Sequence, residues 1–250
     1  SIKRRLVSDV EVGSFLSGGI DSSIVSALAS RQHGKDKLKT FTIGFNEKAY
    51  DERPYARKVA EYIGVDHHEK VLHVCEPDTL KRLLLDRVGQ PFSDSSILPT
   101  AEVSGLAAGH VKVALSGDGA DELFCGYQRY KARAILNVYR WVPAPVRMMM
   151  RKWVSLLPEK DVHHSRSMLK KLHLFMDVMD RRDAEDPYVA AVFFSDKVFD
   201  QLFPSLKQKS HNFNQPWVSD ISLPDIKKMM LADSFVYLPQ DIHTKVDRAS

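Results

Sequence analysis

Residues 17–23 of this chain, SGGIDSS, combine two adjacent glycines with hydroxyl and carboxylate side chains. They follow an apolar run at 10–16 and precede a helical pattern. Adjacent glycines let the backbone approach an anion closely, and the N–H groups at the start of a helix carry partial positive charge. The hydroxyls of Ser17, Ser22 and Ser23 add further donors. The segment therefore predicts a phosphate-binding loop.

This loop lacks the lysine of the G-x-x-x-x-G-K-[ST] pattern, which argues against a P-loop of that kind. Asp21 would repel phosphates unless a divalent cation neutralised both, so Asp21 is a candidate Mg²⁺ ligand. A plainer interpretation is also open. Asp21 or Ser22 can serve only as a helix cap, with the glycines forming only a tight turn.

A second loop of the same kind lies at 116–127, SGDGADELFCGY. Its glycines permit a close turn, and Asp118, Asp121 and Glu122 bring three carboxylates to the start of a helix. Negative charge is favoured in the first turn of a helix, which explains the acidic residues without any metal. Three crowded carboxylates opposite a phosphate loop instead favour Mg²⁺. On this hypothesis a nucleotide and its metal bind between the two loops.

The elements that must position these loops are strands alternating with helices. Apolar runs that predict strands lie at 10–16, 39–45, 67–74 and 111–116. Helical spacing of apolar residues occupies the intervals at 21–33, 51–64, 77–88 and 97–109. This alternation predicts a parallel, twisted α/β sheet with flanking crossover helices. Because parallel strands end on one edge, both loops should meet there.

The pattern of apolar residues changes after about residue 134, where amphipathic helical stretches replace the predicted strands. We expect an α/β part at 1–134 and a mainly helical part of the same domain at 135–250. Links are expected at 158–166 and 204–222. Residues 1–10 resemble the last turns of a helix that enters a strand, and residues 246–250 carry no helix-terminating signal. We therefore expect a domain that is truncated at both ends.

Composition excludes several function classes. The 250 residues carry 36 Lys and Arg against 32 Asp and Glu, an excess too small to predict nucleic-acid binding. No apolar run approaches the roughly 18 residues of a membrane span. Two cysteines cannot build a disulfide scaffold. We expect a soluble, cytoplasmic protein without a membrane or nucleic-acid partner, and keep a homodimer open beside a monomer.

The two loops together carry a family resemblance. SGGIDSS resembles the pyrophosphate loop of the N-type ATP pyrophosphatases, which have an adenine nucleotide alpha hydrolase-like fold. Paired with SGDGADELFCGY, it resembles the synthetase domain of the glutamine-hydrolysing asparagine synthetase family, which includes the β-lactam synthetases. Other pyrophosphatases with the first loop lack the second. Further blocks match in the family's order at 41–45, 51–69, 90–100 and 237–250, whereas 135–230 matches poorly.

The resemblance implies an ATP-dependent ligase. In that family ATP adenylates the side-chain carboxylate of aspartate with release of pyrophosphate, and ammonia then displaces AMP to give asparagine. The pyrophosphate loop corresponds to Ser17, Gly18, Gly19, Asp21, Ser22 and Ser23. Mg²⁺ ligands correspond to Asp21 and Asp121, positions flanking the adenine to Leu16 and Ile43, and positions near the ribose and the substrate to Ser116 and Gly117.

Three further residues take the positions that the resemblance associates with catalysis. Asp118 matches a carboxylate at the reacting end of the substrate, where it could orient the amine or help to deprotonate ammonia. Arg248 matches an arginine near the phosphates and is flanked by Lys245. A guanidinium there would stabilise charge at the α-phosphate.

The chain also departs from the family pattern. It lacks the glutaminase domain with its N-terminal cysteine nucleophile, so ammonia would come from a domain outside this chain. It also lacks the later segment that supplies a catalytic lysine, and we expect the fragment to be inactive alone. Cys125 stands where the family commonly has Gly. Two alternatives stay open: the same chemistry on another carboxylate (a sugar acid, peptide or β-lactam precursor), or a nucleotide-binding module without catalysis.

Overall fold

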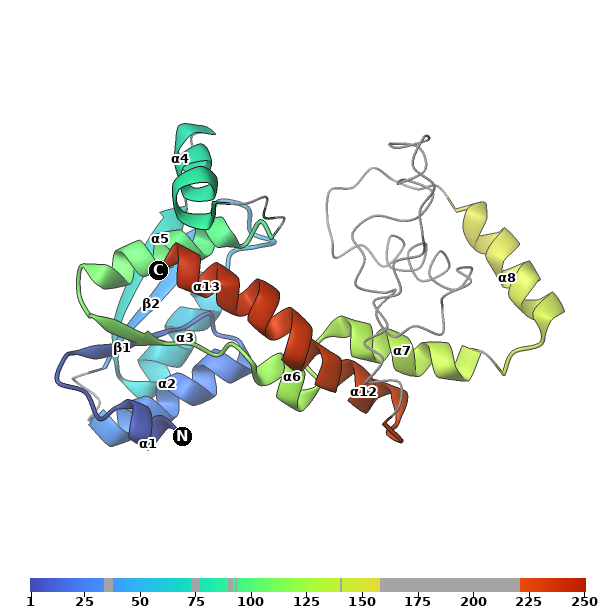
Figure 1. Cartoon of the computed structure of the whole chain (residues 1–250), viewed down its shortest axis with the longest axis horizontal. Helices are drawn as coiled ribbons and strands as arrows, with labels where there is room; N and C mark the ends of the chain where they lie inside the picture. Colours follow the sequence, from blue (N-terminus) through green and yellow to red (C-terminus); the bar gives the residue numbers. More distant parts are fainter. Residues whose placement is uncertain (34–37, 73–76, 90–91, 93, 140, 158–220) are drawn as a thin grey trace. The chain divides into compact units, whose positions relative to one another are not determined.

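The computed structural model describes residues 1–33, 38–72, 77–89, 92, 94–139, 141–157 and 221–250 (Figure 1). Internal contacts divide the chain into two compact units. The first comprises Ser1–Ala120 together with Val236–Ser250, and the second comprises Asp121–Phe235. The predicted links at 158–166 and 204–222 lie outside the described residues, apart from Ile221 and Ser222.

The first unit is built on a parallel sheet of four strands in the order β3-β2-β1-β4. The strands are β1 (Val12–Phe15), β2 (Lys39–Phe45), β3 (Asp66–Leu72) and β4 (Val113–Leu115). This confirms the predicted α/β fold and its strands, although β1 and β4 are shorter than their apolar runs. Ser14 of β1 lies opposite Thr40 of β2 and Leu115 of β4.

Helices connect the strands as the periodicity predicts. The connecting helices are α2 (Ile20–His33), α3 (Arg53–Ile63), and α4 (Pro77–Arg82) with α5 (Ile97–Ala108). The first unit also contains α1 (Ile2–Arg5), which precedes β1, and α13 (Thr244–Ala249), which lies near the C-terminus. Two further segments are π-helical: η2 (Leu83–Val88) continues α4, and η4 (Asp233–His243) precedes α13. The sequence predicts helix in both regions but does not distinguish π-helix from α-helix. In Figure 1, α2 and α3 lie together on one side of the sheet and α5 covers the other. Right-handed crossovers require this arrangement when the strand order reverses after β3.

Two apolar clusters fill the space between the sheet and its helices. Leu16, at the end of β1, packs on Ala56 and Ala60 of α3. Phe41 of β2 packs on the other face against Ala107 of α5 and Val111. Each fully buried large side chain of this kind stabilises the fold by roughly 1.5–3 kcal/mol. The first cluster thus fixes the carboxyl end of β1, from which the first loop extends, and the second anchors β2 in the middle of the sheet.

The second unit is helical over its described residues, which contain no strand. Its helices are α6 (Ala120–Phe124), which begins at the unit boundary, α7 (Gln128–Tyr139), α8 (Ala144–Ser155) and α12 (Asp225–Ala232). A buried polar network joins distant parts of this unit. The Tyr130 hydroxyl donates to Asp233 Oδ2 at 2.6 Å, and an Arg129 nitrogen lies 2.9 Å from the same oxygen. Burial raises the pKa of the Asp233 carboxyl despite these partners.

Across the described residues, every helix is too short or too polar to be a candidate membrane span.

Candidate functional site

A cavity of about 430 Å³ opens at the carboxyl edge of the sheet, and all of its lining residues belong to the first unit. Its walls come from the ends of β1 and β2, both glycine loops, the start of α5 and α13. The structure brings ten of the predicted site residues together on this cavity: Leu16, Ser17, Gly19, Asp21, Ser22, Ile43, Ser116, Gly117, Asp118 and Lys245. The edge that strand topology predicts is therefore the edge that carries the cavity.

Gly18 shapes the first loop from outside the cavity. Its φ angle is +80°, a conformation that L side chains rarely adopt. A Cβ atom at Gly18 would lie 2.6 Å from the Ala56 nitrogen and from Tyr55 Cβ at the start of α3. Gly18 thus lets the loop lie directly on α3, and it is not among the residues that line the cavity.

The serine hydroxyls of the first loop have two different environments. Ser17 Oγ and Ser22 Oγ lie 2.9 Å apart on the cavity wall, and the Gly19 N–H donates to Ser17 Oγ at 3.2 Å. Ser22 Oγ and Ser23 Oγ both donate to the Gly19 carbonyl, at 3.3 Å and 2.6 Å, but Ser23 does not line the cavity. Ser17 and Ser22 are therefore the hydroxyls placed to meet a ligand.

The two glycine loops touch at Gly117. A Cβ atom there would lie 2.9 Å from the Ser22 nitrogen and 3.3 Å from Asp21 Cβ. Glycine at 117 is what allows the second loop to reach the start of α2. Asp21 and Asp118 therefore line the same cavity, although Asp21 follows β1 and Asp118 follows β4.

The carboxylates suit a cation that shares its coordination with a ligand. Among the described residues, no group of three or more His, Cys, Asp or Glu is arranged to hold a metal ion by itself. Mg²⁺ is commonly held by one or two carboxylates together with phosphate oxygens and water. Asp21, beside a loop of N–H and hydroxyl donors, fits that kind of site.

Asp121 and Glu122 belong to the second unit. Both lie in the first turn of α6, but Glu122 is 1% exposed and accepts a hydrogen bond from the Tyr127 hydroxyl at 2.6 Å. That partner gives Glu122 a packing role, and neither residue is among those lining the cavity.

Cys125 ends α6 in a left-handed conformation, with a φ of +62°. The next residue, Gly126, donates its N–H to the Asp121 carbonyl at 3.0 Å, which closes the helix in the manner of a Schellman motif. Glycine usually occupies the position of Cys125 in this motif because it has no Cβ. The structure thus supplies a backbone reason for the glycine that the family resemblance implies here.

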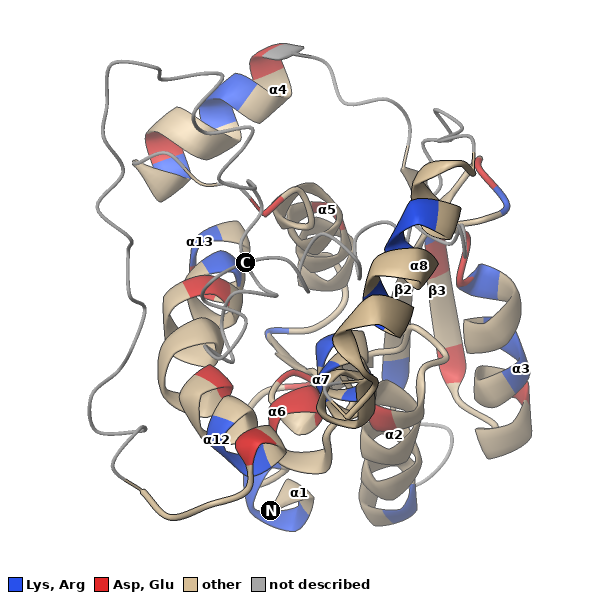
Figure 2. Ribbon diagram, turned by 90° about the vertical axis from the view of Figure 1, so that its right-hand side faces the viewer, with Lys and Arg blue, Asp and Glu red and all other residues tan. Residues whose placement is uncertain are grey.

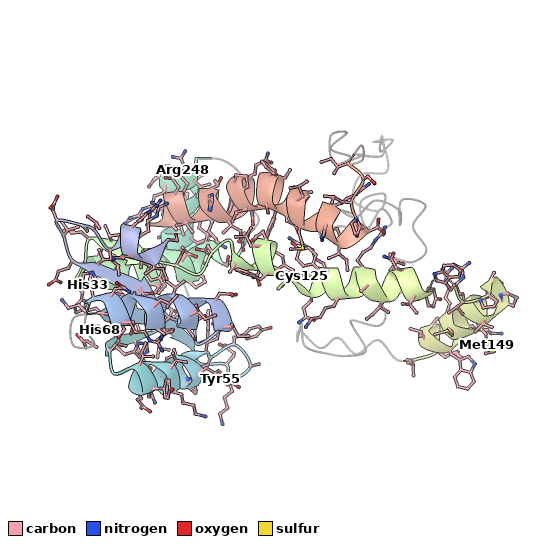
Figure 3. All side chains as sticks on the ribbon, turned by 90° about the horizontal axis from the view of Figure 1, so that it is seen from below. His33, Tyr55, His68, Cys125, Met149 and Arg248 are labelled. Atoms are coloured by element: carbon pink, nitrogen blue, oxygen red, sulfur yellow. The ribbon has the colours of Figure 1, made fainter. Side chains whose placement is uncertain are left out.

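Two basic residues of α13, Lys245 and Arg248, differ in burial and in their position relative to the cavity. Lys245 is 9% exposed, lines the cavity and donates to Asp94 Oδ2 at 2.9 Å and to Ser96 Oγ at 2.7 Å. The Arg248 side chain is about half exposed, with Nε 3.6 Å from Asp247, and it extends outward from α13 in Figure 3. Arg248 is not among the cavity residues.

Sequence reasoning missed the wall formed by the start of α5. Ser96, Pro99, Thr100 and Val103 line the cavity there, and Asp94 lies just before them. Burial alone would raise the pKa of the Asp94 carboxyl, but hydrogen bonds from Ser96 and Lys245 outweigh it and hold the pKa below its usual value. The available signal was the family-like block at 90–100, which ends at this wall. The remaining unpredicted lining residues are Phe15, Phe41, Thr42, Phe45, Glu52 and Val246.

Comparisons with known proteins agree with the sequence resemblance. A family model described as "Asparagine synthase" matches residues 1–250. A Mycobacterium bovis protein, provisionally named asparagine synthetase [glutamine-hydrolyzing], is 33% identical over 99% of this chain and 37% of its own length. The Bacillus subtilis protein named asparagine synthetase [glutamine-hydrolyzing] 1 is 31% identical over 99% of this chain and 38% of its own length. The chain therefore spans well under half the length of these relatives.

Proposed function

We propose that this chain, which belongs to the asparagine synthase family, binds ATP in the 430 Å³ cavity and provides the adenylation site of an amide-forming ligase. The observation that carries the proposal is the contact between the two glycine loops at Gly117 and Ser22. It joins a cluster of N–H and hydroxyl donors to two carboxylates on one cavity, which suits a polyphosphate accompanied by a cation.

The residues of the cavity divide among the parts of the nucleotide. The first loop would hold the β- and γ-phosphates through its N–H groups and the hydroxyls of Ser17 and Ser22. Leu16 and Ile43, at the ends of β1 and β2, would flank the adenine, and Ser116 and Gly117 would lie near the ribose. Asp21 would hold Mg²⁺, which neutralises phosphate charge when bound. Asp121 does not line the cavity, and its role as a second ligand stays a prediction.

The chemistry follows from this placement. An oxygen of the acceptor carboxylate attacks the α-phosphorus, the bond from that phosphorus to the bridging oxygen breaks, and pyrophosphate leaves. Ammonia then attacks the acyl carbon, loses a proton, and AMP leaves with formation of an amide. The protein contributes mainly positioning and charge stabilisation to such phosphoryl transfer.

Asp118 is the residue we propose for the acceptor side. Asp118 is an exposed residue of the cavity wall, in the loop that touches Asp21 at Gly117. There it would orient the incoming amine and accept its proton. A role for Arg248 at the α-phosphate stays a prediction, and Arg248→Gln would test it through the rate of adenylation.

We propose aspartate as the acceptor and ammonia as the second substrate. The names of the relatives support both, since each is called an asparagine synthetase that hydrolyses glutamine. The ammonia would come from a glutaminase domain. Amidation of a sugar acid, a peptide or a β-lactam precursor is the competing outcome.

Pyrophosphate release tests this proposal. The full-length chain is supplied with ATP, Mg²⁺ and ammonia, and candidate carboxylates are compared one at a time. We expect release that depends on aspartate and falls by about a hundredfold in Asp118→Asn. Glu102→Gln is the matched control, because Glu102 forms an exposed ion pair with Lys70 on the same unit. Release that depends only on a different carboxylate would reject aspartate, and absence of release with every carboxylate would reject the ligase assignment.

A further inference from the structure

Lys245 belongs to a nearly enclosed polar network in the cavity wall. Its ammonium Nζ lies 2.9 Å from Asp94 Oδ2 and 2.7 Å from Ser96 Oγ, and Ser96 Oγ donates in turn to Asp94 Oδ2 at 2.7 Å. The Lys245 and Asp94 side chains are 11% and 19% exposed. Asp94 Oδ1 also accepts the Ser96 N–H at 2.9 Å. One carboxylate therefore fixes both the start of α5 and the ammonium.

The position of this network gives it a mechanical role. On its apolar side, α13 is held by Ala249, which packs against Leu83, Val88 and Ile97. The network fastens the other end of α13 to the segment that begins α5, and Ser96 and Thr100 of that segment line the cavity. Figure 2 shows Lys and Arg beside Asp and Glu on α13. Lys245 is the basic residue of this helix that lines the cavity.

Two of the three N–H donors of the ammonium are therefore used within the wall. Removing a nearly buried cation from its carboxylate leaves that carboxylate desolvated and unpaired, which is strongly unfavourable. A direct contact between Lys245 and a ligand phosphate would require that separation or depend on the remaining donor alone.

We infer that Lys245 is a positioning residue, which acts on a bound ligand by fixing the wall formed by the start of α5, through Asp94 and Ser96. This inference rests on the proposed function only in taking ATP with Mg²⁺ as the ligand. It assigns Asp94 and Ser96 to the same positioning unit.

The charges around Asp94 provide the means of testing the inference. The charged groups that face Asp94 are Lys245 from α13 and Asp241 from η4. Burial raises the pKa of the Asp241 carboxyl, and the negative charge of Asp94 raises it further. Loss of Lys245 alone would leave Asp94 and Asp241 without their cation behind the wall of a site for an anion. Loss of the Lys245 and Asp94 charges together would restore the original net charge.

A double-mutant cycle separates positioning from direct contact. Calorimetry would give the dissociation constant of a nonhydrolysable ATP analogue with Mg²⁺ for the wild type, Lys245→Met, Asp94→Asn and the double variant. We expect Lys245→Met and Asp94→Asn each to weaken binding by about tenfold or more, and the double variant to bind no more weakly than Lys245→Met, because both changes remove the same network. An Asp94→Asn variant that binds as tightly as the wild type, or a double variant weakened by the product of the two single effects, would overturn the inference.

The pH profile adds a readout that general loss of structure would not produce. In Lys245→Met, Asp94 loses one of the interactions that lower its pKa and can take up a proton as the pH falls. Binding by Lys245→Met should therefore improve from pH 8 to pH 5.5 more steeply than binding by the double variant. Equal pH dependence in these two variants would contradict the inference.

Chemical labelling tests the network without any nucleotide. A small amine-acylating reagent, followed by mass spectrometry, would compare Lys245 with Lys70, whose side chain is 52% exposed beside Glu102. We expect slow labelling of Lys245 that rises by about fivefold or more in Asp94→Asn and is unchanged in Glu102→Gln. Equal rates for Lys245 and Lys70 in the wild type would overturn the inference. If the wild type binds no nucleotide, the proposed function fails, and the labelling rates still decide whether Asp94 holds Lys245.

Discussion

Gly117→Ala is the substitution that most directly disturbs the contact between the two loops. The new Cβ atom would lie 2.9 Å from the Ser22 nitrogen and 3.3 Å from both Asp21 Cβ and the Asp21 carbonyl carbon. Ordinary van der Waals contacts begin near 3.4 Å, so the loops must separate by about half an ångström. The obstructing atoms are mainly backbone and cannot rotate away as the end of a flexible side chain would.

Overpacking of this kind typically costs about 1–3 kcal/mol. If the whole cost falls on the ligand-bound state, the dissociation constant of an ATP analogue with Mg²⁺ rises by roughly 5- to 150-fold. Calorimetry measures this change, and urea unfolding measures how much of the cost falls on the free protein.

Gly105→Ala is the matched control for this prediction. Gly105 lies within α5, and a Cβ atom there would meet nothing within 4 Å. Alanine in a helix is favoured over glycine by about 0.5–1 kcal/mol, so this variant should be slightly more stable and bind the analogue normally. If Gly117→Ala is folded and binds as tightly as the wild type, the contact between the loops does not shape the ligand site.

Three further predictions concern stability, measured by urea unfolding. Cys125→Gly should raise the free energy of unfolding by about 1 kcal/mol, because glycine accepts the +62° φ angle without a Cβ conflict; a lower value would contradict this account of the helix end. Leu16→Ala should lower it by about 2–5 kcal/mol, since Leu16 is 1% exposed, whereas Leu85→Ala, at a 62% exposed residue, should change it by less than about 0.5 kcal/mol. In Asp241, burial and the charge of Asp94 raise the carboxyl pKa above its ordinary 3.8, so ionisation costs stability as the pH rises through the folded-state pKa. Asp241→Asn should therefore gain stability relative to the wild type between pH 4 and pH 7, and an unchanged difference between these two pH values would contradict the assigned cause.

The sheet and the main wall of the cavity could be predicted from local patterns. Alternating apolar runs and helical spacing identify the four strands and their crossovers, and the parallel topology places both glycine loops on one edge. Ser17, Asp21 and Gly117 then meet at the cavity because each follows the end of a strand. Local sequence carries this information because periodicity determines which face of each element is buried.

Contacts between distant residues could not be predicted in the same way. Lys245 and Asp94 are 151 positions apart, and no local pattern links them. The sequence pattern of an acidic residue in a first helical turn is the same whether its carboxylate contacts solvent, a metal or a neighbouring tyrosine. The burial of Glu122 against Tyr127 therefore could not be predicted from the sequence. The same limit applies to Gly18, whose partner is the start of α3 rather than the cavity. These outcomes depend on tertiary packing.

The most direct test of a metal-bound nucleotide in this cavity is calorimetry of a nonhydrolysable ATP analogue, with and without Mg²⁺, on the wild type, Asp21→Ala and Asp121→Ala. We expect binding by the wild type that requires Mg²⁺ and that weakens by about tenfold or more in Asp21→Ala. A comparable loss in Asp121→Ala would support Asp121 as the second ligand. Binding that is independent of Mg²⁺ and unchanged in both variants would contradict the assignment of this cavity to a metal-bound nucleotide.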